Sequence, residues 1–190
     1  MSELNAFLLS KLLWNPAVDT DAAIGSFLRG FYGPNAATFV MEYLSLLHGE
    51  AVLQGYSVRS AVWTDVNTAA NGYLSPPIVL AAARAFARAL EVSIEDGDAA
   101  HIRVQGAAMA IYWTILHRWV EMRNYALVST TPWPLQQQQQ QQQPTLGAAF
   151  ETFSAYYNVT AKRWRGRGLS SVTYPNLALL PNAQPWSHKW

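Results

Sequence analysis

The stretch Leu12–His48, LLWNPAVDTDAAIGSFLRGFYGPNAATFVMEYLSLLH, decides the fold class of this chain. Its apolar residues recur at spacings of three and four, the period of one buried helix face. Asp19 or Thr20 can offer a side-chain oxygen to the free N–H groups that begin a helix. Gly33 suits the left-handed backbone that follows a helix end, and Pro34 suits the first turn of the next helix. The stretch therefore predicts two helices joined by a tight turn.

Another helix is predicted at the start of the chain, with Ser2 as its cap. It should end near Trp14, because Asn15-Pro16 stops it. Apolar residues occupy most of its sides, so we expect it to be buried on most sides. The helix that starts at Pro34 should end near Gly49. We interpret residues 50–74 as irregular.

Two further helices are predicted in the middle of the chain. Ser75-Pro76-Pro77 opens a helix that runs to about Glu95. Asp98 caps the longest helix, over residues 99–127, in which Arg118 flanks the apolar seam and should lie on the surface. The seam, spaced by threes and fours, consists of Val104, Ala108, Ile111, Ile115, Trp119 and Met122. We expect this helix to be the centre of the bundle, with Ile111, Ile115 and Trp119 facing Phe27, Phe31 and Tyr43 or their neighbours.

The fold class that follows is all-α, a helical bundle of about five to six helices. We expect the bundle core in residues 1–128 and a Pro/Gln-rich disordered loop in residues 129–144. The last helix should span residues 145–165 and an irregular tail residues 166–190. The loop contains the eight glutamines Gln136–Gln143, which cannot bury apolar surface.

Composition excludes several classes of function. Charged residues make up only 13% of the chain and the net charge is +1, which argues against nucleic acid or an anionic membrane as the main ligand. The apolar runs are too short to cross a membrane. Without cysteine there is no disulfide, thiolate metal site or cysteine catalysis. Because charged residues are so sparse, we expect part of the apolar surface to meet a partner.

The acidic and histidine residues indicate little chemistry. Two sets of acidic residues lie at predicted helix starts, where capping explains them: Asp19 with Asp21, and Glu95 with Asp96 and Asp98. Asp65 lies in an aromatic, apolar setting, and we interpret it as a turn former rather than a catalytic acid. His117 and Glu121 lie four apart on one helix, which favours a surface pair over a metal site. We assign no catalytic residue, cofactor or metal.

Aromatic side chains offer a second kind of site, since their flat faces stack on sugar rings. Most fall on predicted buried stripes, where core packing explains them. Trp133, Trp186 and Trp190 lie outside the predicted helices and are possible platforms. The candidate contacts for a carbohydrate or a protein partner are Trp63, Asp65, Trp133 and Trp186. The basic cluster Lys162–Arg167 is interpreted as the charged end of the last helix rather than an RNA site.

Several motifs occur in a recognisable order: LLWNP (12–16), FLRGFYGP (27–34), YLSLLH (43–48), YLSP (73–76) and RVQGAAMAIYWTIL (103–116). These motifs and their order resemble those of a family of uncharacterised glycoside-hydrolase-like proteins that carry a domain of unknown function. The family resembles α-glucuronidases and β-hexosaminidases, with a central (β/α)-barrel followed by a helical C-terminal region. The resemblance implies that this chain corresponds to the helical region.

Barrel enzymes carry their catalytic acids at the ends of barrel strands, so the resemblance transfers no catalytic residue to this chain. It implies a helical C-terminal module that lacks the barrel and is inactive alone. The partner would then be the missing N-terminal barrel domain. A free-standing helical protein-interaction module is the alternative, and a carbohydrate-binding module is the third. The sequence indicates no compartment.

Overall fold

The computed structural model describes residues 1–55, 73–129, 151, 153–155 and 158. The helices are α1 (Ser2–Trp14), α2 (Thr20–Tyr32), α3 (Pro34–Leu53), α5 (Pro76–Val92), α6 (Asp98–His117) and α7 (Trp119–Val128). In these parts of the chain all regular structure is helical, so the predicted all-α fold class is confirmed. The candidate residues Trp63, Asp65, Trp133 and Trp186 lie outside the described residues, as do most of the predicted loop and the whole tail.

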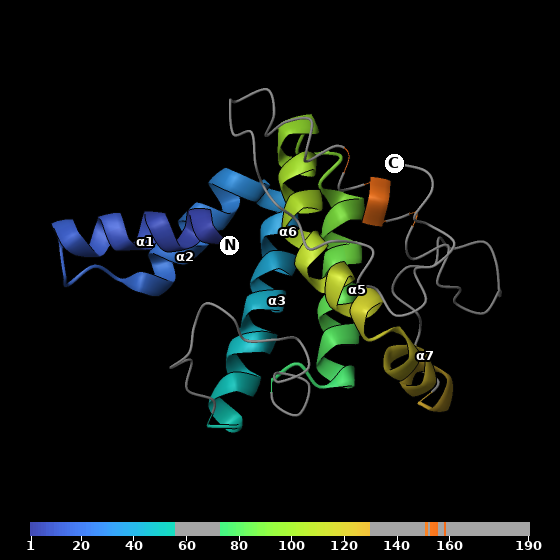
Figure 1. Ribbon diagram of the computed structural model, residues 1–190. Coiled ribbons are helices and arrows are strands. Elements are labelled where there is room, and N and C mark those ends of the chain that lie inside the picture. Colours follow the sequence, from blue (N-terminus) through green and yellow to red (C-terminus); the bar gives the residue numbers. More distant parts are fainter. Residues whose placement is uncertain (56–72, 130–150, 152, 156–157, 159–190) are drawn as a thin grey trace.

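The centre of the bundle is α5, and the prediction that the helix after Asp98 would be central is wrong. Helices α3, α5 and α6 run alternately up and down (Figure 1), and α5 packs against α3, α6 and α7. Four alanines of α5 are buried, namely Ala82, Ala83, Ala85 and Ala89. Small side chains let neighbouring helices approach on more than one side, which suits α5 to the middle. Tyr43 of α3 accordingly packs against Phe86 of α5, with ring centroids 4.6 Å apart.

The predicted seam is nevertheless buried. Five of its six members are buried: Val104, Ala108, Ile111, Ile115 and Met122. Trp119 is half-buried. The described residues of the predicted last helix are helical, and Phe153 is buried beside Trp113, with ring centroids 5.8 Å apart.

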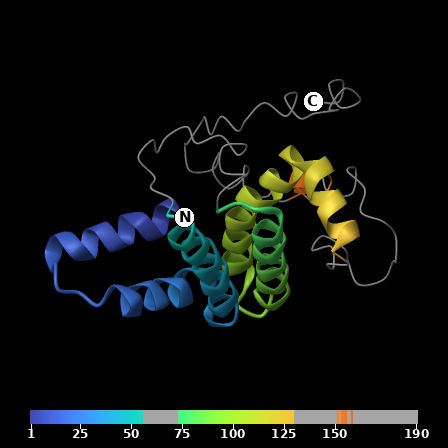
Figure 2. The ribbon, with the colours of Figure 1, turned by 90° about the horizontal axis from the view of Figure 1, so that it is seen from below.

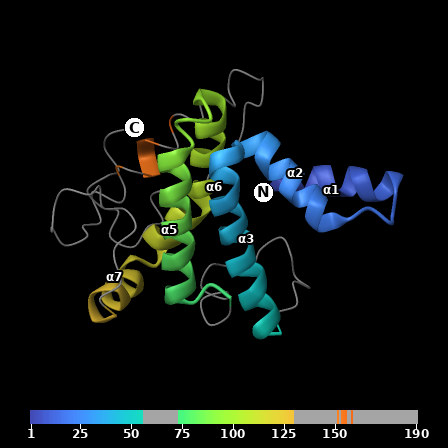
Figure 3. The ribbon, with the colours of Figure 1, turned by 180° about the vertical axis from the view of Figure 1, so that it is seen from behind.

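Helices α1 and α2 form an arm that projects from one side of the bundle (Figures 2 and 3). The ring centroids of Phe7 on α1 and Phe27 on α2 lie 5.2 Å apart, so the inner face of α1 packs on α2. The expectation that α1 would be buried on most sides is wrong, because Leu9, Leu13 and Trp14 are 60%, 85% and 92% exposed. Among the described helices, α1 packs chiefly on α2.

Both ends of α2 are formed as the sequence predicted. The Asp19 carboxylate accepts hydrogen bonds from the backbone N–H groups of Asp21 and Ala22, both at 3.0 Å, and so caps α2. Gly33 has a φ of +95°, as its place after a helix predicted, and Pro34 begins α3. These turn residues were correctly assigned.

Several helix ends differ from prediction. Met1, not Ser2, is the residue before α1, and no side chain caps it. Helix α3 continues past Gly49 to Leu53, so the start of the stretch interpreted as irregular is helical. Gly97, not Asp98, precedes α6. The predicted helix over residues 99–127 is broken at Arg118, whose φ of −107° and ψ of 33° separate α6 from α7.

Replacing Ile115 by alanine tests the buried face of α6. Ile115 is completely buried, so the substitution should leave a cavity and lower the free energy of unfolding by about 2–5 kcal/mol. The exposed Asn124→Ala on α7 is the control and should change it by no more than about 0.5 kcal/mol. Urea denaturation followed by circular dichroism measures both. Equal midpoints for the two variants would contradict the assigned face.

Candidate functional site

Asp96 connects the turn after α5 to the start of α3. Its carboxylate accepts hydrogen bonds from the backbone N–H groups of Asn35 and Ala36, both at 3.1 Å, and from the Asn35 side-chain amide at 3.0 Å. Because Gly33 has no side chain, the first N–H groups of α3 have no acceptor of their own. Asp96 supplies one. A Cβ atom at Gly33 would come within 2.3 Å of the Asp96 carboxyl group, so only glycine fits there.

The interpretation of the acidic residues as caps is therefore correct for Asp19. Asp96 is also a cap, but it caps α3 and not the helix that follows it in the chain. The helix that Asp96 caps was missed, because it begins about 60 residues earlier in the chain. The available signal was a helix start with glycine where a capping side chain normally stands.

Ser93, His101 and Gln105 form a second polar cluster at the same end of the bundle. The hydroxyl of Ser93 donates to the Leu90 carbonyl at 3.0 Å and lies 2.8 Å from Nδ1 of His101. Nε2 of His101 lies 3.0 Å from the amide nitrogen of Gln105, so both ring nitrogens have a polar neighbour. Ser93 is completely buried and its proton is already engaged, so this serine–histidine pair joins α5 to α6 and offers no accessible nucleophile.

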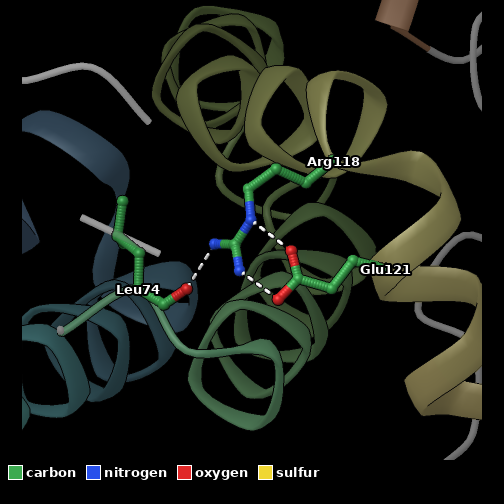
Figure 4. Close-up of polar contacts among 3 residues, drawn as sticks. All are labelled: Leu74, Arg118 and Glu121. Atoms are coloured by element: carbon green, nitrogen blue, oxygen red, sulfur yellow. Dashed lines mark hydrogen bonds and ion pairs between the residues drawn. The ribbon is translucent and has the colours of Figure 1, made fainter. Parts of the chain in front are cut away.

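Arg118 forms the third cluster, at the break between α6 and α7 (Figure 4). Its guanidinium donates from Nε and Nη2 to the two carboxylate oxygens of Glu121, at 2.8 Å and 2.7 Å, and from Nη1 to the Leu74 carbonyl. Arg118 is only 5% exposed, so its predicted place on the surface is wrong. The sequence favoured a pair of Glu121 with His117, but Glu121 pairs with Arg118 instead. The break turns Arg118 inward, toward the start of α5.

Two tyrosines, Tyr32 and Tyr43, are buried among the helices. Burial raises the pKa of Tyr43 to about 12 and also raises that of Tyr32 well above its usual value. Both phenols are therefore neutral at ordinary pH. The Tyr32 hydroxyl donates to the sulfur of Met1 at 3.4 Å, which ties the start of α1 to the end of α2.

Metal ions have no evident site in the described parts of the chain, since no group of three or more histidine or acidic side chains gathers there. None of the helices described there combines the length and apolarity that a membrane crossing requires. The polar clusters that the structure does describe all hold helices together.

An apolar stripe lies on the outer face of α1. We call Ala6, Leu9 and Leu13 the α1 stripe. All three are exposed, while Leu4 and Phe7 on the other side of the helix face the rest of the molecule. The residues that border the stripe, Asn5 and Ser10, are exposed and uncharged.

Comparison with known proteins identifies one region. The model of a family described as a domain of unknown function, DUF4838, matches residues 1–45. The match covers α1, α2 and the first part of α3. No curated protein and no solved structure matches the chain. The likeness to a domain of unknown function is thus supported over the arm, while the relation to glycoside hydrolases remains a proposal.

Removing the Arg118 side chain should destabilise the bundle. Arg118→Ala leaves the Leu74 carbonyl without its donor and should lower the free energy of unfolding by about 1–3 kcal/mol. Arg118→Met keeps the apolar stem and separates packing from hydrogen bonding. The exposed pair of Arg88 and Glu42 is the matched control, and Arg88→Ala should lower this free energy by about 1 kcal/mol at most. Urea denaturation gives all three values, and equal losses for Arg118→Ala and Arg88→Ala would refute the role assigned to Arg118.

Removing the Asp96 carboxylate should uncap α3. Asp96→Ala is expected to lower the free energy of unfolding by about 0.5–2 kcal/mol, the usual loss for a missing cap. Glu95→Ala, one residue earlier and exposed, should have little effect. Hydrogen exchange of the Asn35 and Ala36 amides provides the specific readout. These amides should exchange faster in Asp96→Ala, and unchanged exchange would mean that they have another acceptor.

Proposed function

We propose that this chain is a helical, non-catalytic module of a larger glycoside-hydrolase-like protein. The observation that carries the proposal is the α1–α2 arm. The arm lies within the stretch matched by the domain of unknown function, and it contains the LLWNP and FLRGFYGP motifs of the family resemblance. It also presents apolar side chains away from its own bundle. In the larger protein that surface would pack on the barrel domain.

Three polar groups that hold the helices together support a module without its own chemistry. The carboxylate of Asp96 is used as a cap, the hydroxyl of Ser93 is buried, and Glu121 is held by Arg118. Each has a structural partner within the bundle, so none is left to act on a substrate. The proposed relation to glycoside hydrolases, and the barrel domain as the partner, come from the resemblance of the sequence motifs.

A free-standing protein-interaction module is the second candidate. The exposure of Leu9 and Leu13 favours it, because contiguous exposed apolar side chains on a protein of low charge mark an interaction surface. Carbohydrate binding is the third candidate and rests on Trp63, Asp65, Trp133 and Trp186 as sequence candidates.

An activity assay tests the absence of catalysis. Incubating the full chain with aryl glycosides and with uronic-acid-capped oligosaccharides should give no turnover above the buffer rate. The physical reason is that the regular structure of the described residues is helical, whereas such enzymes carry their catalytic acids at the ends of barrel strands. Turnover well above buffer that Asp65→Asn abolishes would overturn the proposal, and Asp98→Asn is the matched control on an acid at a helix start.

A further inference from the structure

We infer that Arg103 of α6 is the clamp that fixes the direction of the α1–α2 arm on the bundle. At the base of the arm, Leu28 and Tyr32 of α2 are buried in the core and hold the end of α2 there. Arg103 adds a contact that continues outward along the arm. Such a clamp acts on the arm whichever partner the arm meets.

A row of packed aromatic side chains runs from α1 through α2 to Arg103. The ring centroids of Phe7 and Phe27 lie 5.2 Å apart. Those of Phe27 and Phe31 lie 5.0 Å apart, and the planes of these two rings differ by only 17°. The guanidinium carbon of Arg103 lies 4.7 Å from the centroid of the Phe31 ring, where a cation is attracted to the aromatic face. The row therefore connects both helices of the arm to α6.

The same guanidinium also binds the end of α2. Its Nη1 donates a hydrogen bond to the backbone carbonyl of Phe31 at 2.8 Å. Phe31 is the last residue but one of α2, so its carbonyl has no acceptor role left within the helix. A positive charge is favourable there, because the C-terminal end of a helix carries a partial negative charge. Arg103 thus holds both the ring and the backbone of one residue.

Arg103 and Asp96 together hold the two helix ends that meet at Gly33. Asp96 accepts from the first N–H groups of α3, and Arg103 donates to the last turn of α2. Each charge has the sign that its helix end favours. Both residues belong to the segment 96–103, which is the end of a turn and the first part of α6. The two helix ends are therefore attached to one body.

The cost of this arginine indicates what it is for. Its Nε atom is buried and has no hydrogen-bond partner among the described residues. An apolar side chain of similar length, such as methionine, would avoid the cost of that unpaired donor. The benefit of Arg103 is therefore its hold on Phe31 rather than burial in general.

Distances between pairs of spin labels, measured by pulsed electron paramagnetic resonance, test the clamp. The chain contains no cysteine, so introduced cysteines alone carry the labels. Ser26→Cys with Glu91→Cys labels two exposed positions and spans arm and bundle, from α2 to α5. Glu91→Cys with Asn124→Cys, also exposed, lies within the bundle and is the internal control.

The parent chain should give one narrow distance distribution for each pair. Arg103→Met should widen the arm–bundle distribution about twofold or more, because the released helix samples several directions. It should leave the bundle pair unchanged. Phe31→Leu should widen the arm–bundle distribution in the same way. Combining the two substitutions should add little, since both remove the same contact.

Arg29→Met is the matched control. It removes an exposed arginine from the same last turn of α2, so both distributions should stay as in the parent chain. An arm–bundle distribution that stays narrow in Arg103→Met would overturn the inference, because the buried Leu28 and Tyr32 would then suffice to direct the arm. A broad arm–bundle distribution in the parent chain would overturn it as well.

A second substitution covers the case in which Arg103→Met unfolds the chain. Circular dichroism and a widened bundle pair would reveal that unfolding, and Arg103→Lys then replaces it. Lysine keeps the charge but lacks the flat guanidinium that both stacks and donates. The arm–bundle distribution should still widen while the bundle pair stays narrow, and a narrow arm–bundle distribution would contradict the clamp.

Discussion

The close packing of α5 is the constraint on which the rest of the structure depends. Its alanines allow α3 and α6 to approach it from two sides, and the buried Phe86 fills the space beside Tyr43. A helix in this position must be fixed at both ends. Leu74, just before α5, accepts from Arg118, and Ser93, just after it, is bonded to His101. Polar contacts thus join both ends of α5 to the helices that pack against it.

The local features of the fold could be predicted from the sequence because they depend on neighbouring residues. Asp19 caps the helix that follows it, and Gly33 with Pro34 makes the turn that their backbone preferences require. The apolar seam of α6 followed from its spacing. The continuation of α3 to Leu53 was missed because β-branched and small residues at its end give a weak periodic signal.

The errors share a different cause, which is dependence on distant residues. Arg118 looks like a surface residue until the start of α5 is placed beside it. Asp96 looks like a cap for the next helix, but the free N–H groups nearest to it belong to α3. The exposed side of α1 could not be foreseen, because a one-sided arm and a buried helix have the same apolar composition. The sequence candidates Trp63, Asp65, Trp133 and Trp186 stay predictions.

The contact between Asp96 and the start of α3 has a consequence for the order of folding. The N–H groups of Asn35 and Ala36 receive their acceptor from a residue about 60 positions later. During synthesis the first turn of α3 therefore emerges long before the carboxylate that completes it. Contacts so far apart in sequence form slowly, since a long loop must close first. The joint between arm and bundle should accordingly be among the last parts of the native structure to become rigid.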